Sequence, residues 1–284
     1  MTKAKPFIKW VGGKSQLIEQ LDAQLPADFG NWDNVTYIEP FVGGGAMLFY
    51  LLQRYPNIQH AVINDINQDL VICYKTVRDS LGLLIESLKD IEKTYLSLQT
   101  EEKRKDFFMA ARERYNEKGL DPIENTTKFF FLNRTCFNGL YRVNKKGLFN
   151  VPFGKYANPT ICDPNTLRKD SELLQRVEIL TGDFEDTFDY ANGNTFFYFD
   201  PPYRPLSDTS SFNDYTKEAF NDDAQIRLKK YCDKINESGY KFMLSNSDCK
   251  GKDEKDNFFD MLYEAYQIER VWASRSINSN PNKR

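Results

Sequence analysis

The chain has 284 residues, 40% of them hydrophobic and 14% aromatic, which is typical of a globular protein with one large core or two modest ones and excludes disordered and fibrous proteins. No apolar run approaches the roughly 18 residues of a membrane span, and no signal-peptide core follows the N-terminus, so we expect a soluble cytoplasmic protein that does not enter a membrane. Because the 41 acidic residues outnumber the 38 basic ones and the net charge is −3, any nucleic-acid surface must be a local concentration of basic charge.

The first motif is a glycine pair followed by Lys14 and Ser15, and it opens an expected helix with apolar positions at Leu17, Ile18 and Leu21. Its Gly-Lys-Ser ending resembles a phosphate-binding loop, but that loop needs a glycine where the chain has Ile8, so a nucleotide triphosphatase is disfavoured. The glycines could still expose backbone N–H groups beside Lys14 and hold a carboxylate or a phosphate. A flexible cap with a solvated lysine is an equally good interpretation.

A strand, a glycine loop and a helix follow, which is how nucleotide-binding folds begin. We expect strands at 35–39 and 60–63, separated by glycines at 43–45 and a helix from 46 to about 55. The second strand ends at Asn64-Asp65, where an acid commonly holds ribose hydroxyls. The third glycine of the dinucleotide pattern would fall at Leu48, which is too bulky. A ligand without a pyrophosphate, such as S-adenosylmethionine, is therefore favoured.

Helical periodicity predicts amphipathic helices between 68 and 91 and from 101 to 118. The next segment, 125–162, contains no acidic residue, whereas its basic residues are Lys128, Arg134, Arg142, Lys145, Lys146 and Lys155. In an acidic protein this composition indicates a surface that binds a polyanion. We expect Phe129–Leu132 to be core, and a β-hairpin near 134–150 to read DNA.

The C-terminal half predicts further strands and helices of an α/β fold. We expect a helix after Asp163-Pro164, strands at 177–180, 240–245 and 267–273, a helix from about 217 to 238, and loops at 205–215 and 248–256. The strand at 177–180 ends in Gly182-Asp183-Phe184, which would flank a ligand.

The run from Thr195 to Tyr203 carries the strongest indication of chemistry. Four aromatic residues predict a buried parallel strand, and two prolines end it in a stiff turn. Asp200 is then held at the carboxyl end of a strand, the edge where open α/β sheets bind ligands. Asp200 and the Pro201 carbonyl could accept from an NH2 group while the Tyr203 ring stacks on the attached ring, as a nucleobase amine requires. The structural alternative is that the prolines only end the strand and that the acid stands there by chance.

Cysteine and histidine usage argues against a metal centre and against disulfides. The five cysteines are scattered without a CxxC pair, so we interpret them as reduced packing thiols. His60 is the only histidine, which disfavours a Ser-His-Asp triad and a histidine-rich metal site. We therefore expect no metal.

Five motifs occur in chain order: Lys9-Trp10-Val11-Gly12-Gly13-Lys14, Glu39-Pro40-Phe41-Val42-Gly43-Gly44-Gly45, Asn64-Asp65, Gly182-Asp183-Phe184 and Asp200-Pro201-Pro202-Tyr203. Together they resemble the Dam-like class of adenine-specific DNA methyltransferases over essentially the whole chain. Segments 138–142 and 149–154 resemble the subgroup that recognises GATC. The resemblance implies transfer of a methyl group from S-adenosylmethionine to adenine in double-stranded GATC, protecting host DNA in a restriction–modification system.

The resemblance also implies a fold and a set of site residues. The fold would be α/β, a Rossmann-like methyltransferase with a mixed sheet from residues 1–67 and 160–284, interrupted by a mostly helical target-recognition domain at 68–159. The donor would be bound by Trp10, Lys14, Glu39, Phe41, Gly43, Gly45, Asp65, Asp183, Phe184 and Asp200, and the target adenine by the catalytic residues Asp200, Pro201, Pro202 and Tyr203.

DNA contacts are expected from Lys9, Arg134, Phe137, Asn138, Leu140, Arg142, Lys145, Lys146 and Pro152. By the resemblance, Lys9, Leu140, Arg142 and Pro152 face bases, whereas Phe137 and Asn138 fill or prop the duplex. Phe137 departs from the tyrosine that close relatives often have, so no hydroxyl acts there.

Three alternatives stay open on the residues alone. A nucleotide-dependent oxidoreductase would need the missing third glycine, and a DNA module that only binds would not need a donor pocket. An RNA or protein-amide methyltransferase also uses a Pro-Pro-Tyr loop, often with asparagine before it, where this chain has Asp200.

Overall fold

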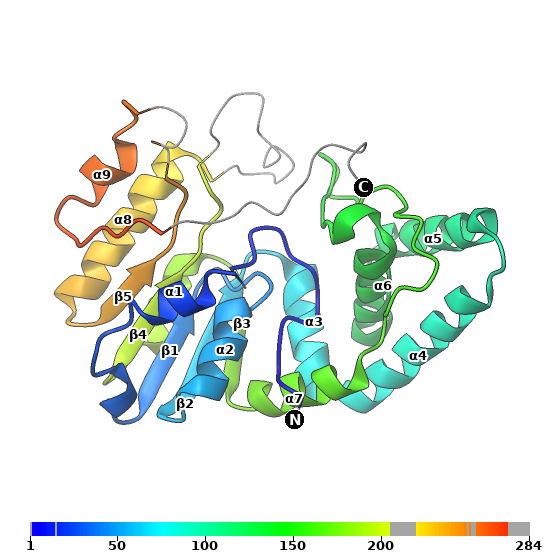
Figure 1. The fold of residues 1–284 in the computed structure, drawn as a ribbon, viewed down its shortest axis with the longest axis horizontal. Helices are drawn as coiled ribbons and strands as arrows, with labels where there is room; N and C mark the ends of the chain where they lie inside the picture. Colours follow the sequence, from blue (N-terminus) through cyan, green and yellow to red (C-terminus); the bar gives the residue numbers. More distant parts are fainter. Residues whose placement is uncertain (1, 15, 205–219, 249, 251–253, 272–284) are drawn as a thin grey trace.

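The centre of the fold is a sheet of five parallel strands in the order β3-β2-β1-β4-β5 (Figure 1). The strands are β1 (Val35–Glu39), β2 (Ile58–Asp65), β3 (Val177–Thr181), β4 (Thr195–Phe199) and β5 (Lys241–Leu244). This computed structural model describes the chain except for residues 1, 15, 205–219, 249, 251–253 and 272–284. Strands β1 and β4 are buried along their whole length, as central parallel strands covered on both faces should be.

Helices cover both faces of the sheet. The α-helices are α1 (Ile18–Asp22), α2 (Ala46–Arg54), α3 (Gln68–Asp79), α4 (Leu81–Ser97), α5 (Glu101–Asn116), α6 (Pro122–Thr135), α7 (Pro164–Leu174), α8 (Asp222–Glu237) and α9 (Phe258–Leu262), and the 3-10 turns are η1 (Phe29–Asn31), η2 (Phe137–Gly139) and η3 (Phe184–Tyr190). One buried cluster joins one sheet face to α2, α3 and α7, and a second joins the other face to η3 and α8. No helix among the described residues is long and apolar enough to cross a membrane.

Side-chain caps start several helices where the sequence predicts. The side chain of Asp163 accepts from the Thr166 amide at 3.1 Å, and Pro164 occupies the first turn of α7. Asn221 caps α8 in the same way, so the helix expected from residue 217 begins at Asp222; residues 217–219 lie outside the described residues. The predicted core at Phe129–Leu132 is confirmed, since all four side chains are buried.

Two expected elements are wrong in part. Residues 267–271 of the predicted last strand form no regular structure, and 272–273 lie outside the described residues. Ile268 and Val271 are exposed there, so the segment has no buried apolar face that would hold it against the sheet. The strands found among the described residues all pair in parallel. The hairpin expected near 134–150 is shorter than predicted, because α6 extends to Thr135 and η2 follows. It is limited to 142–150, where Val143 and Phe149 form an antiparallel bridge and the Asn150 amide donates to the Arg142 carbonyl at 3.1 Å.

The strand order reverses direction between β1 and β4. The chain moves outward from β1 through β2 to β3 on one side and from β4 to β5 on the other, so the connections diverge at the carboxyl ends of β1 and β4. Open α/β sheets bind ligands at this reversal. Glu39 ends β1 and Asp200 follows β4, which brings two of the predicted site residues to this point.

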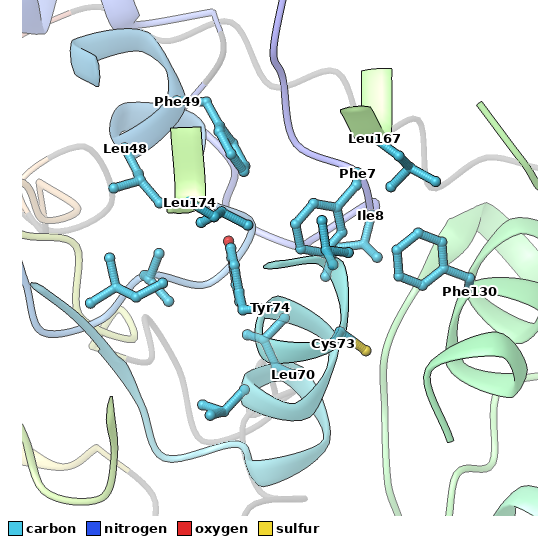
Figure 2. Packing of buried hydrophobic residues seen from close by; sticks show 14 of the residues in the cluster. Phe7, Ile8, Leu48, Phe49, Leu70, Cys73, Tyr74, Phe130, Leu167 and Leu174 are labelled. Atoms are coloured by element: carbon cyan, nitrogen blue, oxygen red, sulfur yellow. The ribbon is translucent and has the colours of Figure 1, made fainter. Parts of the chain in front are cut away.

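Helices α3–α6 are inserted in the connection between β2 and β3 and lie to one side of the sheet (Figure 1). The N-terminal segment runs between this helical region and α2, and Figure 2 shows Phe7 between Phe49 of α2 and Phe130 of α6. The Phe7 ring stacks on Phe130 with centroids 5.4 Å apart and lies edge-on to Tyr74 of α3 at 4.9 Å. One continuous core therefore fixes the helical region against the sheet and carries the N-terminal motif to the site.

A buried acid on α7 anchors the same segment and predicts pH-dependent stability. The Lys5 amide donates to Oδ1 of Asp170 at 3.0 Å, whereas Oδ2 is buried without a partner among the described residues. Burial raises the pKa of Asp170 from 3.8 to about 8. The folded state thus keeps the carboxyl protonated where the unfolded chain ionises it, so this contribution to stability is complete below pH about 4 and is lost as the pH rises to about 8.

Asp170→Asn should remove this pH dependence because the amide does not titrate. We expect the free energy of unfolding of the variant minus that of the parent to increase as the pH rises from 5 to 8, by at most about 1.4 kcal/mol per pH unit. Urea unfolding at a series of pH values measures this difference. A difference that stays constant with pH would show that the carboxyl ionises equally in both states.

Candidate active site

Asp200 directly follows β4, on a turn held by neighbouring elements. The Ser245 amide donates to the Phe199 carbonyl at 2.8 Å, which keeps β4 paired up to its last residue. Beyond Asp200, the Pro202 carbonyl accepts from Nε2 of Gln225, a fully buried side chain of α8. Prolines fix φ, and α8 holds Pro202 through this hydrogen bond. The backbone next to Asp200 is therefore rigid, which fixes the position of the carboxylate.

The side chain of Lys14 reaches Asp200 and Tyr203 together. Its Nζ forms an ion pair with Asp200 Oδ1 and lies 4.6 Å from the centre of the Tyr203 ring, and Lys14 is only 5% exposed. Burial raises the pKa of Asp200, although the Lys14 ammonium acts in the opposite direction. Burial by itself would lower the pKa of Lys14, but the neighbouring Asp200 and Tyr203 together raise it above its ordinary value. A protonated amine thus sits between a carboxylate and the face of an aromatic ring.

Glu39 adds a second buried carboxyl group at the end of β1. It is 2% exposed, and Tyr37 Oη donates to its Oε2 at 2.8 Å. Burial raises the pKa of Glu39 well above its ordinary value. Two acidic side chains therefore lie at the carboxyl ends of β1 and β4, and of these two Asp200 forms an ion pair with Lys14.

Asp65 closes the glycine loop from the end of β2. Its Oδ2 accepts from the Gly43 amide at 3.0 Å and its Oδ1 from the Asn67 amide at 2.9 Å. Burial raises the pKa of Asp65, and the two amides oppose this by stabilising the charged form. Each carboxylate oxygen has a second lone pair, so the same group can accept hydroxyl donors from a ligand.

Trp10 packs on this loop so closely that glycine is required at residue 43. Gly43 has a φ of +48°, and a Cβ atom there would lie 2.9 Å from Cδ1 of the indole. Gly45 also has a positive φ of +71°, and a Cβ there would meet Tyr74 Oη at 2.5 Å. The glycines predicted to shape a donor pocket thus also allow close packing of Trp10 and Tyr74.

Asp183 and Phe184 complete the edge after β3. Arg227 of α8 donates to both carboxylate oxygens of Asp183, Nη1 to Oδ2 at 2.9 Å and Nη2 to Oδ1 at 2.5 Å. Burial alone would raise the pKa of Asp183, but the guanidinium and the Glu185 amide hold it below its usual value. Phe184 is buried, and its ring centre lies 5.2 Å from that of Phe41, so these two predicted donor-site residues are in contact.

An aromatic stack links the glycine loop to the acid-free segment. The Trp10 ring stacks on Tyr141 at 5.3 Å, and Tyr141 stacks on Phe129 of α6 at 5.1 Å. Tyr141 lies between Leu140 and Arg142, two residues predicted to face bases. Trp10, which packs on the glycine loop, is therefore in direct contact with the predicted DNA-reading segment.

Asn133 of α6 fastens Lys9 to that segment. Its side chain accepts from the Lys9 amide at 2.8 Å and donates to the carbonyls of Lys9 and Gly139, both at 2.9 Å. Asn133 is buried, and Gly139 has a φ of +65° with Lys9 packed where a Cβ would be. These contacts bring the exposed Lys9 next to η2, which contains Phe137 and Asn138.

The remaining predicted DNA contacts lie in the loops beyond η2. Phe137 is 43% exposed, and its amide donates to the Pro152 carbonyl at 2.8 Å, so these two residues are neighbours. Arg142 Nε donates to Asn150 Oδ1 at 2.8 Å, which orients the guanidinium. Lys145 and Lys146 are exposed at the turn before Gly147.

Arg134 is the exception within this group. Its Nη2 donates to the Phe7 carbonyl at 2.7 Å, and its Nε is buried without a partner among the described residues. Burial lowers the pKa of Arg134. The side chain fixes the N-terminal segment, and it also lines a hollow of about 230 Å³ with Lys9 and Tyr156.

Comparison with known proteins decides the family. The model of the D12 class of N6 adenine-specific DNA methyltransferases matches residues 10–277. The chain belongs to this family. It is therefore an enzyme that methylates DNA adenine with S-adenosylmethionine as the methyl donor, and the RNA and protein-amide alternatives are not supported.

Relatives of this D12-class methyltransferase match it along almost their whole length. The type II methyltransferase M.MjaIII of Methanocaldococcus jannaschii is 49% identical over 99% of this chain and 96% of its own. The type II methyltransferase M1.LlaDCHI of Lactococcus lactis subsp. cremoris is 35% identical over 99% of this chain and 92% of its own. The DNA adenine methylase of Haemophilus influenzae is 33% identical over 99% of this chain and 91% of its own.

The residues at the strand ends of the methyltransferase fit such a donor. S-adenosylmethionine carries hydroxyl and amino groups that donate hydrogen bonds, and acidic side chains that can accept them lie at or just after the ends of β3, β2 and β4: Asp183, Asp65 and Asp200. The buried Glu39 ends β1 beside them. Lys14 could in turn pair with a ligand carboxylate.

Sequence reasoning missed three residues that hold this site together: Asn133, Gln225 and Arg227. Only Asn133 had a signal, as a polar residue beside the predicted core run at 129–132.

Proposed function

We propose that this methyltransferase modifies adenine in double-stranded GATC and protects host DNA in a restriction–modification system. The segments 138–142 and 149–154 support the target, since they resemble the GATC subgroup and DpnM, the methylase of the DpnII system. Two relatives are named type II methyltransferases, which supports the restriction–modification role. Residues 68–159 act as the target-recognition domain, residues 1–67 and 160–284 as the catalytic domain, and the enzyme acts in the cytoplasm.

The position of the Lys14 amine carries the proposal for the catalytic site. Asp200 accepts from this amine while the Tyr203 ring covers it, so the site already holds an N–H donor against an acceptor and a ring face. The exocyclic amine of a flipped adenine needs the same two partners. Lys14 must move away when the base enters, and the carboxylate of the donor is a suitable new partner for its charge.

The reaction then depends on acceptors at the adenine amine. The donor supplies an electrophilic methyl group on its sulfonium sulfur. The amine lone pair of adenine is delocalised into the ring, and hydrogen bonds to Asp200 and the Pro201 carbonyl favour the pyramidal nitrogen that develops as the methyl group transfers. These bonds are stronger in the transition state than in the ground state, which is the condition for catalysis. Asp200 need not be a strong base, since the methylated nitrogen becomes acidic and loses its proton late.

Donor binding is assigned to the remaining residues of the strand edge. Asp65 accepts the ribose hydroxyls, Asp183 and Phe184 bind the purine, and Lys14 and Trp10 hold the amino-acid end, with Glu39, Phe41, Gly43 and Gly45 shaping the pocket. The contacts of Gly43 with Asp65 and Trp10 support this arrangement because they join three of the residues assigned to the donor.

Target reading is assigned to the surface around η2. Lys9, Leu140, Arg142 and Pro152 face bases, Phe137 and Asn138 fill or prop the duplex, and Lys145 and Lys146 contact phosphates. The exposed ring of Phe137 supports a wedge role, since apolar side chains inserted at a base step unstack it. Arg134 contributes by holding Phe7 and lining the hollow beside Lys9.

Digestion of methylated plasmid tests the target sequence. Plasmid from a host without adenine methylation is incubated with the enzyme and donor, then cut with GATC nucleases of differing methylation sensitivity. We expect protection only from the nuclease that adenine methylation blocks. Incorporation of labelled methyl groups without such protection would show a different target site.

Asp65→Ala tests the donor assignment. Because hydrogen bonds to a charged group contribute about 1.5–3 kcal/mol, we expect donor binding to weaken by that amount. Asp65→Asn, which retains an acceptor for the Gly43 amide, should lose less. Calorimetry on folded protein measures both, and an unchanged dissociation constant for the alanine variant would move the ribose site elsewhere.

A further inference from the structure

Arg227 contacts three consecutive residues at the end of β3. Its two terminal nitrogens bind the Asp183 carboxylate, its Nε donates to Glu185 Oε1 at 2.7 Å, and the guanidinium carbon lies 4.6 Å from the centre of the Phe184 ring. A planar guanidinium thus uses its edge for two carboxylates and its face for a ring. Single contacts of this kind are common on surfaces, but the combination fixes both side chains assigned to the donor purine.

These contacts are strong enough to orient Asp183. The two side chains are 47% and 41% exposed, and most ion pairs at such sites contribute little. A bidentate arginine–carboxylate pair within a network is the exception, since two parallel bonds fix the plane of the carboxylate. Arg227 and the Glu185 amide both donate to Oδ1 of Asp183, whereas Oδ2 accepts only from Arg227 and so keeps one lone pair for a ligand.

The backbone around Asp183 is supported without Arg227. The Asp183 side chain caps η3 through the Glu185 amide at 2.9 Å, and Phe184 packs on Tyr231 of α8 with ring centres 5.6 Å apart. Thr187 and Tyr231 share a buried hydrogen bond of 3.0 Å. Replacing Arg227 should therefore release Oδ2 of Asp183, while the Glu185 amide still holds Oδ1 and η3 stays folded.

We propose that Arg227 is a positioning residue that makes the donor site selective for a 6-aminopurine, by holding Asp183 as an oriented acceptor for the exocyclic amine and Phe184 as the adjoining apolar wall. This inference rests on the proposed assignment of Asp183 and Phe184 to the donor purine. A 6-oxopurine presents an acceptor at the same position, which an oriented carboxylate rejects.

Binding of S-adenosylhomocysteine and its inosine analogue tests the inference. We expect the parent enzyme to bind the adenosine compound much more tightly by calorimetry. Arg227→Met should weaken that compound about tenfold, the order expected when a charged partner leaves a hydrogen-bonded network, and should change the inosine compound little. Arg227→Lys, which keeps the charge but not the bidentate geometry, should restore only part of the selectivity.

Arg114 provides a matched control. It pairs bidentately with Glu124 at 2.9 Å for both bonds and also with Glu117, with similar exposure, but it lies on α5 in the helical region. Arg114→Met should leave the affinities for both compounds unchanged. Equal weakening of both compounds by Arg227→Met, or of neither, would overturn the inference, because a positioning role must change their ratio.

Asp183→Asn separates this inference from the proposal beneath it. If Asp183 binds the purine, this variant loses selectivity, and adding Arg227→Met to it has no further effect on the ratio. If Asp183→Asn weakens the adenosine compound but Arg227→Met alone does not, only the role of Arg227 is wrong. If Asp183→Asn has no effect, the purine site itself lies elsewhere.

Discussion

Asp200→Ala is expected to abolish methyl transfer while the donor and the duplex still bind. The change removes an acceptor that matters mainly as the amine nitrogen becomes pyramidal, so its effect falls on turnover more than on binding. Removing one oriented group from a site of this kind costs about 10²–10³ in rate, and the loss of a charged one should be at least that large. Single-turnover assays with labelled donor measure the chemical step directly.

The Lys14 ion pair determines the controls for this experiment. Asp200→Ala leaves the buried ammonium of Lys14 without its carboxylate, so part of any defect could arise from a disturbed fold. Asp200→Asn keeps an acceptor oxygen and should retain a small residual rate. Thermal unfolding and calorimetry with S-adenosylhomocysteine verify that each variant is folded and binds. Near-normal turnover by the alanine variant would sink the proposed mechanism.

The sheet could be predicted from sequence because its strands are locally distinctive. Continuous apolar runs such as Thr195–Phe199 belong to parallel strands buried on both faces, and turn residues mark their ends. The strand expected near the C-terminus shows the limit of this reasoning. Ile268 and Val271 have strand propensity, but the described part of that segment has no buried face, and burial depends on the rest of the fold.

Site residues could be predicted from the sequence only where one short motif contains both the reactive side chain and the elements that position it. Asp200 and Tyr203 follow a strand directly, so their position at the sheet edge follows from local sequence. The pairing of Lys14 with Asp200 joins residues 186 positions apart, and Asn133 reaches Lys9 across 124. Such contacts depend on the packing of α6 and the N-terminal segment around Phe7, which no local pattern encodes.

The same packing places the glycine loop next to the segment that we propose reads DNA. Trp10 closes on the glycine loop with one edge and stacks on Tyr141 with its face. Lys9, the preceding residue, is held against Gly139 by Asn133. The glycine loop and the segment that contains Leu140 and Arg142 are therefore joined by direct contacts of Trp10 and Lys9.

Arg142→Ala is expected to relax the target sequence, whereas Lys146→Ala should weaken binding to every sequence. A guanidinium that reads a guanine edge contributes about 1–3 kcal/mol of discrimination at one base pair. Asn150 orients Arg142 through Oδ1, so Asn150→Ala should reproduce part of the same loss. Competition binding against duplexes with single-base changes in GATC measures the discrimination at each position.

The lysine variant is distinguished by its dependence on salt. A lysine bound to phosphate releases about one counterion, so Lys146→Ala should reduce the slope of log K against log salt by about one unit on GATC and other duplexes alike. Lys241 is a suitable control because it is exposed at the start of β5, on the sheet edge opposite the strand ends, and its replacement should leave the slope unchanged. If Arg142→Ala lowers affinity for every sequence equally, Arg142 grips the backbone, and specificity must come from Lys9, Leu140 and Pro152.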